Sequence, residues 1–172
     1  MEDMTLSDKQ AKRCHTAAGF AFRDGKILLV KHKKLGIWLA PGGHVEENEL
    51  PHQAAEREFL EETGVKAEAI SAYPMPSAAA SQSLPLPFFG NLHEINKPRS
   101  HTGTFCEQHY GYGYLLRISD DSGLGRQEEE VDDIGWFGRD EIESLETTED
   151  VKNELRFIFD HFPQNSESLS LV

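Results

Sequence analysis

Three glutamates lie close together in the second quarter of this 172-residue chain. Glu58, Glu61 and Glu62 stand at positions i, i+3 and i+4, which fall within about 100° of arc on an α-helix. Like charges at this spacing repel one another. A folded protein keeps them together most readily when a cation neutralises them, and carboxylate oxygens suit a hard divalent ion such as Mg²⁺. The spacing therefore predicts a metal site, although acidic runs are also typical of solvated helix faces.

Residues before the cluster could complete such a site. Gly42 and Gly43 lack side chains, so the backbone there can approach an ion or a phosphate closely, and the Gly42 carbonyl is a candidate additional ligand. Arg57 can pair with Glu49 or Glu61, which would orient the cluster.

A helix over residues 50–63 would position these side chains. Asn48 is the expected N-cap, and Pro51 falls in the first turn, where its missing N–H is no loss. Gly64 stands where a left-handed residue ends a helix.

The whole stretch from Gly43 to Val65 resembles the Nudix box. That pattern is a glycine, five residues, a glutamate, seven residues, and then Arg-Glu-apolar-x-Glu-Glu-x-Gly-apolar. Every fixed position is matched here, by Gly43, Glu49, Arg57, Glu58, Phe59, Glu61, Glu62, Gly64 and Val65. Phe59 is bulkier than the aliphatic residue usual at its position, which concerns packing rather than chemistry. A spaced match of this length is much more specific than a short glycine motif.

The resemblance implies the α/β/α sandwich of the Nudix family around a mixed β-sheet, an α+β fold that agrees with the coarse order of strands, helix, strands and C-terminal helices. It implies hydrolysis of the diphosphate linkage in a nucleoside diphosphate derivative, such as a nucleoside triphosphate, a nucleotide sugar or ADP-ribose. Mg²⁺ is the implied cofactor, with Mn²⁺ as the alternative. By motif position, Glu58 and Glu62 are the first-choice metal ligands and Glu61 is a third ligand or the base. Arg57 completes the implied catalytic group as an orienting residue.

Two other classes of protein stay open. One is a non-catalytic nucleotide-binding or regulatory domain of the same fold, which would not need all three acids. The other is an enzyme similar to the isoprenyl diphosphate isomerases, which would want a reactive cysteine near the site. Cys14 and Cys106 are far from the box in sequence, which does not settle their distance in space.

Three residues outside the acid cluster are candidate substrate contacts, besides Gly43. Lys31 opens a basic cluster that leads toward the glycine pair, and could contact phosphate or simply protect a solvated strand edge. Trp38 could cover a base or belong to the core. Tyr112 is the middle of three tyrosines that alternate along 108–118, and period two puts them on one face of a strand, as core packing or as a stacking wall.

A further acid is expected outside the box. Members of the Nudix family often place a metal ligand or base on a late loop, and Glu128, Glu129 and Glu130 are the natural source here. Substrate specificity is expected in residues 74–110, whose Pro- and Ser-rich beginning predicts a long loop.

Composition limits the partners and the compartment. The net charge of −13 argues against binding to a nucleic-acid polymer, and no apolar run approaches membrane length. Both cysteines are expected to be free thiols in a reducing cytoplasm. The chain is expected to comprise a flexible tail at 1–13, a single Nudix domain at 14–162 and a C-terminal tail at 163–172. A homodimer is frequent among such proteins, although no residue here specifies one.

Overall fold

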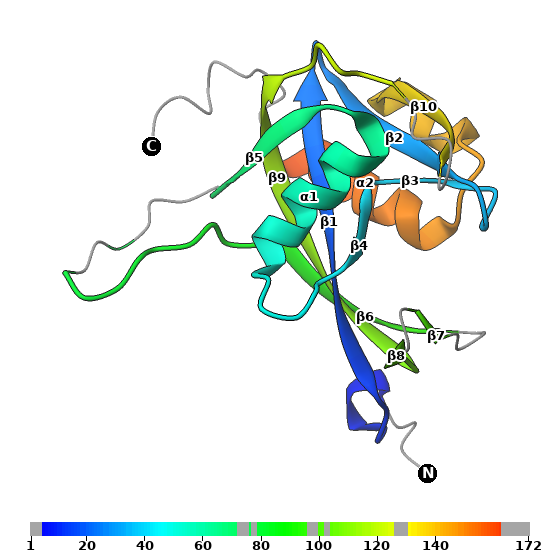
Figure 1. Ribbon diagram of the computed structural model, residues 1–172. Helices are drawn as coiled ribbons and strands as arrows, with labels where there is room; N and C mark the ends of the chain where they lie inside the picture. Colours follow the sequence, from blue (N-terminus) through cyan, green and yellow to red (C-terminus); the bar gives the residue numbers. More distant parts are fainter. Residues whose placement is uncertain are drawn as a thin grey trace.

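The computed structural model describes residues 5–71, 76, 79–95, 100–101, 104–125 and 131–162 (Figure 1). The elements follow in the order η1 (Leu6–Asp8), β1 (Arg13–Arg23), β2 (Lys26–His32), β3 (Trp38–Leu39), β4 (Gly42–His44), α1 (Pro51–Thr63), β5 (Lys66–Ile70), β6 (Phe89–Glu94), β7 (Ser100–His101), β8 (Thr104–Phe105), β9 (Gln108–Asp120), β10 (Val131–Gly138), η2 (Arg139–Ser144) and α2 (Glu149–His161).

The central sheet is mixed. Its strand order is β10-β2-β1-β9-β5, with β3 added to β2, β4 to β1 and β6 to β9. β1 and β9 run parallel from Arg13↔Gln108 to Ala21↔Leu116, whereas the other pairings in this sheet are antiparallel. The Asp24-Gly25 dipeptide in the sequence predicts a tight hairpin turn, and β1 and β2 form that hairpin, with both turn residues at positive φ (51° and 74°).

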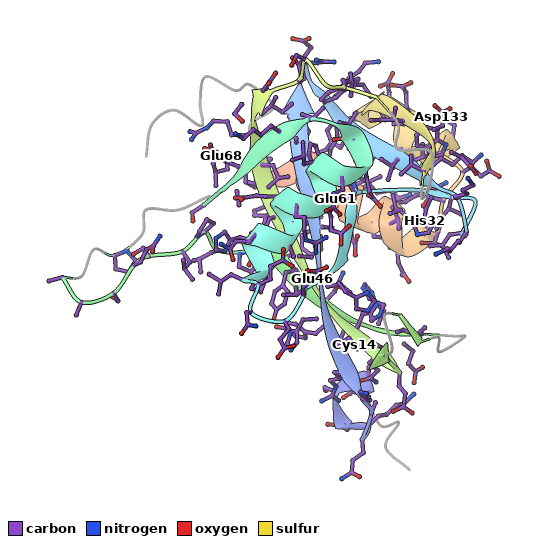
Figure 2. The ribbon with its side chains drawn as sticks, in the orientation of Figure 1. Cys14, His32, Glu46, Glu61, Glu68 and Asp133 are labelled. Carbon is purple, nitrogen blue, oxygen red and sulfur yellow. A yellow bond between two sulfur atoms is a disulfide. The ribbon has the colours of Figure 1, made fainter. Side chains whose placement is uncertain are left out.

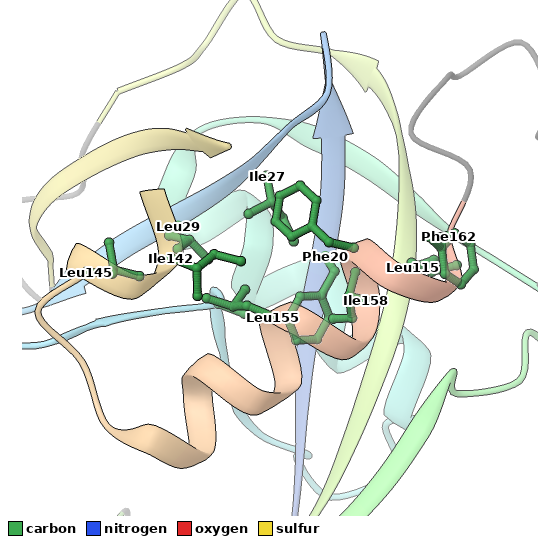
Figure 3. Close-up of a cluster of buried hydrophobic side chains, with 11 residues drawn as sticks. Phe20, Ile27, Leu29, Leu115, Ile142, Leu145, Leu155, Ile158 and Phe162 are labelled. Carbon is green, nitrogen blue, oxygen red and sulfur yellow. The ribbon is translucent and has the colours of Figure 1, made fainter. Parts of the chain in front are cut away.

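Helices cover both faces of the sheet. On one face, α1 buries Ala54, Ala55 and Phe59 against small and apolar side chains of β1, β2 and β9. On the other face, Leu155 and Ile158 of α2 pack with Ile142 of η2 onto Phe20, Ile27, Leu29 and Leu115 (Figure 3). Burial of these two apolar layers holds the sandwich together. The expected α/β/α arrangement around a mixed sheet is confirmed.

Residues 5–13 make more contacts than the flexible tail expected at 1–13 would make. The side chain of Gln108 donates to the carbonyl of Leu6 at 3.1 Å, and its oxygen accepts from Nε of Arg13 at 2.8 Å. Arg13 also donates to the carbonyl of Ser7 at 3.0 Å. Residues 5–13 are thereby attached to the start of β9. Residues 1–4 and the expected C-terminal tail at 163–172 lie outside the described residues.

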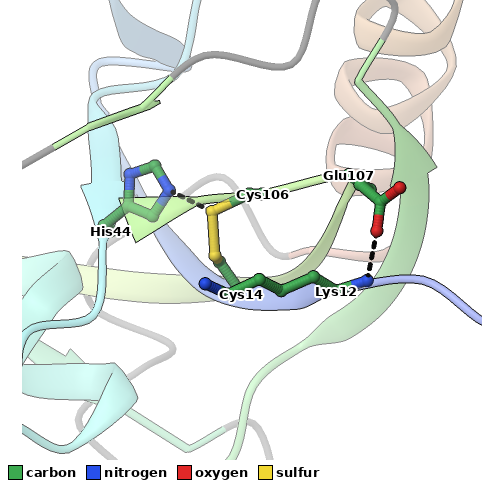
Figure 4. The surroundings of a disulfide bond; sticks show 5 residues. All are labelled: Lys12, Cys14, His44, Cys106 and Glu107. Carbon is green, nitrogen blue, oxygen red and sulfur yellow. Dashed lines mark hydrogen bonds between the residues drawn. A yellow bond between two sulfur atoms is a disulfide. The ribbon is translucent and has the colours of Figure 1, made fainter. Parts of the chain in front are cut away.

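The two cysteines were expected to be free thiols, and that prediction is wrong. Cys14 near the start of β1 and Cys106 just before β9 form a disulfide, with their Cα atoms 5.8 Å apart (Figure 4). They are 92 residues apart in sequence, and the parallel β1–β9 pairing brings them together. The cytoplasmic location inferred from free thiols stays a prediction. Among the described residues, no helix is long and apolar enough to cross a membrane.

Candidate active site

α1 carries the box residues and begins and ends at identifiable positions. Its N-cap is Leu50, with φ −86° and ψ 148°, and the expected N-cap Asn48 instead lies in the loop with φ 67°. Pro51 explains the difference, because a residue that precedes proline is pushed toward extended backbone. At the other end Gly64 adopts φ 70°, and its N–H donates to the carbonyl of Leu60 at 2.8 Å, as expected for the glycine there.

Two acids of α1, Glu58 and Glu62, face the glycine pair of β4. Glu62 is only 4% exposed, and its Oε2 accepts a 3.1 Å hydrogen bond from the N–H of Gly42. The side chain of Glu58 is 13% exposed. A Cβ at position 43 would lie 2.3 Å from Oε1 of Glu58, so the carboxylate occupies the space that any other residue at Gly43 would fill. Gly43 therefore leaves room for the carboxylate of Glu58, and the backbone N–H of Gly42 binds that of Glu62.

Gly42 is fixed from its other side as well. A Cβ there would lie 2.5 Å from the carbonyl oxygen of Ala17 and 2.7 Å from Cα of Ala18, both in the backbone of β1. β4 pairs with β1 at these residues, with Gly42 opposite Ala18 and Gly43 opposite Ala17. The close packing of β4 on β1 thus needs a glycine at position 42.

Arg57 joins the acids into one network. Nε and Nη2 donate to the two oxygens of Glu49 at 2.8 and 3.1 Å, in a bidentate pair. Nη1 donates to Glu58 at 2.8 Å and to Glu61 at 3.2 Å, and Nη2 also donates to the carbonyl of His44 at 3.0 Å. The sequence predicted pairing with Glu49 or Glu61, and the structure shows both, together with Glu58.

The hydrogen bonds of this network shift the pKa values of its members. The hydrogen bond from Arg57 lowers the pKa of Glu49, and burial only partly opposes that effect. The same pair, together with Glu58, raises the pKa of Arg57. Both partners therefore stay charged at neutral pH. The third acid of the helix face, Glu61, is labelled on α1 in Figure 2. It differs from the other two because its side chain is 59% exposed.

These residues suit a hard divalent ion. Glu58 and Glu61 accept from the same nitrogen of Arg57, and Glu62 accepts from the N–H of Gly42, so Arg57 and Gly42 together orient the three carboxylates of this helix face. Carboxylate oxygens beside a backbone carbonyl are the kind of donor that Mg²⁺ or Mn²⁺ prefers.

A surface groove lies along another part of α1. It is lined by Glu46, Glu47, Asn48, Glu49, Gln53, Glu56, Arg57, Leu60, Lys66, Ala67 and Glu68. Two of these residues, Glu46 and Glu68, are labelled in Figure 2. The groove touches the network at Glu49 and Arg57, but Glu58 and Glu62 are not part of its lining.

Lys31 and Trp38 lie opposite each other in neighbouring strands, with partners other than the box acids. Nζ of Lys31 pairs with Glu146 at 2.8 Å, a hydrogen bond that raises the pKa of the lysine. The indole of Trp38 packs edge-on against Phe137, with ring centroids 4.7 Å apart. Their predicted contacts with substrate stay predictions.

The three alternating tyrosines share one face of β9, as their period predicted. Tyr114 is 4% exposed in the core beneath α1, and Tyr112 packs against the same cluster. The hydroxyl of Tyr112 is 2.9 Å from Nδ1 of His15, and its ring is 4.8 Å from that of Tyr110. Core packing accounts for Tyr114, while the role of Tyr112 toward a base is untested. The expected external acids Glu128, Glu129 and Glu130 lie outside the described residues.

On the face of the sheet that α2 covers, one titratable group was not predicted from the sequence. Glu154 of α2 accepts a hydrogen bond from the amide of Asn91 on β6. Burial, with the nearby charge of Asp150, raises the pKa of Glu154 to about 7. The buried oxygen of Asn91 has no hydrogen-bond partner, and a turned amide would let a protonated Glu154 donate to it. A lone glutamate in an amphipathic helix gives no sequence signal of such burial.

An acidic helix packed on a diglycine strand, within a mixed sheet between two helical layers, is the arrangement expected of a Nudix hydrolase. The chain belongs to the Nudix hydrolase family, since the family model described as "NUDIX domain" matches residues 13–158. Two relatives carry provisional names. A Bacillus subtilis (strain 168) protein named 8-oxo-dGTP diphosphatase is 45% identical over 71 residues, or 39% of this chain and 45% of its own length. A Lactococcus lactis subsp. cremoris (strain MG1363) protein named DHNTP pyrophosphohydrolase is 28% identical over 142 residues, or 83% of this chain and 71% of its own length.

Solved structures show the same fold. A NUDIX family hydrolase from Clostridium perfringens superposes with a TM-score of 0.68 at 21% identity, over 87% of this chain and 97% of that one. The E. coli dihydroneopterin triphosphate pyrophosphohydrolase superposes with a TM-score of 0.61 at 16% identity, over 90% of this chain and 100% of that one.

Proposed function

We propose that this chain hydrolyses the diphosphate linkage of a nucleoside diphosphate derivative with a divalent cation, in the first place Mg²⁺. The observation that carries the proposal is the position of Glu58 and Glu62 against the glycine pair, where a side chain at position 43 would displace a carboxylate. Family membership and two relatives named as a diphosphatase and a pyrophosphohydrolase support the same activity.

Glu58 and Glu62 would hold the cation, with Glu61 as a third ligand and the Gly42 carbonyl as an additional one. When bound, the cation would neutralise phosphate oxygens and lower the pKa of a coordinated water. The N–H of Gly42 orients Glu62, and Arg57 orients Glu58 and Glu61 through Nη1. Arg57 is thus a positioning residue, itself held by Glu49 and the carbonyl of His44.

Glu61 is the candidate to accept a proton from the attacking water if it is not a ligand. Its side chain is the most exposed of the three acids, so a solvent-borne nucleophile can reach it. A general base must lie within hydrogen-bonding reach of the proton that it removes. Acids from Glu128 to Glu130 are the alternative source of this base.

Small phosphorylated metabolites are the expected substrates, and a nucleic-acid polymer is not, because the net charge is −13. The names of the two relatives put oxidised nucleoside triphosphates and dihydroneopterin triphosphate first. Nucleotide sugars, ADP-ribose and dinucleotides complete the panel, because the box contacts diphosphate and metal without reading the base.

The test is an activity panel over these compounds with Mg²⁺ and with Mn²⁺, measured as phosphate released after phosphatase coupling. Metal-dependent turnover of at least one compound is expected. Binding of a panel compound without turnover would instead support the regulatory domain. The isomerase alternative is disfavoured, because the disulfide leaves neither Cys14 nor Cys106 as a free thiol. Thiol alkylation after reduction should accordingly leave turnover nearly unchanged.

A further inference from the structure

Sulfur and nitrogen donors converge at a second place in the molecule. The Sγ atoms of Cys14 and Cys106 and a ring nitrogen of His44 all lie within 4.8 Å of one another. Nε2 of His44 is 3.6 Å from Sγ of Cys106 (Figure 4). Cys106 is 1% exposed and Cys14 9% exposed, so the sulfurs are shielded from water.

Two paired strands and the segment that leads into a third place these donors. In β1, Cys14 and Thr16 share a face because alternate residues of a strand do so. Thr16 pairs with His44 at the end of β4. Cys14 pairs with His109 near the start of β9, and Cys106 lies three residues before His109 in the chain. Cys14 and His44 therefore lie in paired strands, and Cys106 is held beside them because the N–H of the next residue, Glu107, donates to the carbonyl of Lys12 at 2.9 Å.

We propose that Cys14, Cys106 and His44 bind a soft divalent ion, Zn²⁺ foremost, once the disulfide is reduced. Thiolate and imidazole are the ligands that Zn²⁺ takes in proteins, at about 2.3 Å for sulfur and 2.0–2.1 Å for nitrogen in a tetrahedron. Those lengths put a sulfur and a nitrogen about 3.6 Å apart. The separation of Cys106 and His44 already has this value.

Only the sulfurs must move. They are about 2.05 Å apart in any disulfide and about 3.8 Å apart on a tetrahedral zinc ion. Rotating either cysteine about its Cα–Cβ bond opens this distance without moving the strands. The fourth position of the ion would be left for water, as in zinc sites with three protein ligands.

A dithiol can reduce the disulfide between Cys14 and Cys106. The dithiol gives two electrons and two protons to the disulfide and becomes a disulfide itself, while Cys14 and Cys106 become thiols. On binding, each thiol releases its proton and forms one bond from sulfur to the ion, and His44 contributes its nitrogen lone pair. The same atoms thus serve as a covalent link under oxidising conditions and as a metal site under reducing ones. Hard ions such as Mg²⁺ are expected to bind at the carboxylates of α1 instead, because Mg²⁺ prefers oxygen ligands.

Cobalt titration of the full chain tests the proposal. The protein is reduced with a phosphine without oxygen, desalted, and titrated with Co²⁺ in excess Mg²⁺, which occupies the carboxylates. One equivalent of Co²⁺ should give a thiolate-to-cobalt charge-transfer band in the near ultraviolet, and one equivalent of Zn²⁺ should remove it. The oxidised protein should give no band, which compares two states of one sequence and needs no variant.

Variants then assign the ligands. Cys14→Ser, Cys106→Ser and His44→Asn should each weaken Co²⁺ binding at least tenfold, whereas the matched control His161→Asn, on the last turn of α2, should bind as the wild type does. Reduced wild type without a charge-transfer band would overturn the proposal. So would an unchanged affinity in His44→Asn. Cobalt bound without the band would place it on oxygen ligands, which also overturns the proposal while leaving the function proposed for the α1 carboxylates intact.

Discussion

Replacing Gly43 with alanine should damage catalysis while sparing the fold. The added Cβ would lie 2.3 Å from Oε1 of Glu58, and ordinary contact begins at about 3.4 Å, so the carboxylate must move by about 1.1 Å. The colliding atoms are the end of a flexible side chain, which can move without the backbone. A misplacement of about 1 Å in a catalytic constellation costs on the order of 10²-fold in rate. We expect kcat with Mg²⁺ to fall by about that factor, with the unfolding midpoint little changed.

Two further glycines serve as controls for this variant. Gly42→Ala would meet the backbone of β1 at Ala17 and Ala18, which cannot move aside, so it should lower the free energy of unfolding as well as activity. Gly90→Ala on β6 meets its nearest atom at 3.5 Å, an ordinary contact, and should leave both unchanged. Wild-type kcat and metal dependence in a folded Gly43→Ala protein would refute the assignment of Glu58 to the site.

Three other perturbations test the framework. Arg57→Lys should lower the free energy of unfolding by about 1–3 kcal/mol, because a lysine cannot remake the bidentate pair with Glu49. The control Arg117→Lys, at an exposed pair with Glu68 of 3.9 Å, should leave that free energy unchanged in urea melts. For Glu154 the native pKa of about 7 exceeds the ordinary 4.5, so between these values the native state keeps a proton that the unfolded chain has lost, and stability falls as pH rises. Glu154→Gln should reduce the loss of unfolding free energy between pH 4.5 and 7 by up to about 3 kcal/mol. The same dependence of unfolding free energy on pH in the variant and the wild type would refute the raised pKa. Reducing Cys14–Cys106 without added metal should cost about 2–4 kcal/mol, and equal urea midpoints with and without reductant would contradict this stabilising role.

Local signals were enough to predict the box and its helix. The i, i+3, i+4 spacing put Glu58, Glu61 and Glu62 on one side of α1, and the turn residues Asp24 and Gly25 predicted the first hairpin. In each case the determinant lies within a few residues of the element that it shapes. The exception is Asn48, where the backbone restriction imposed by Pro51 outweighed the capping preference.

Contacts between distant parts of the chain were beyond the sequence. Nothing near Cys14 indicates that a parallel strand will bring Cys106 to it from 92 residues away. Lys31 likewise finds its partner Glu146 at a separation of 115 residues, so its basic cluster could be read equally as a phosphate contact or a protected edge. Such pairings depend on strand order, which periodicity does not specify.

The most direct test of the central claim is the turnover of Glu62→Gln with Mg²⁺, on whichever substrate the panel identifies. The amide oxygen can still accept from the N–H of Gly42, so the fold should persist, but a neutral ligand replaces a charged one. We predict a fall in kcat of about 10²–10³-fold, with Glu47→Gln, on the exposed loop before α1, unchanged. A folded Glu62→Gln enzyme with wild-type kcat would show that the carboxylates of α1 do not hold the catalytic ion.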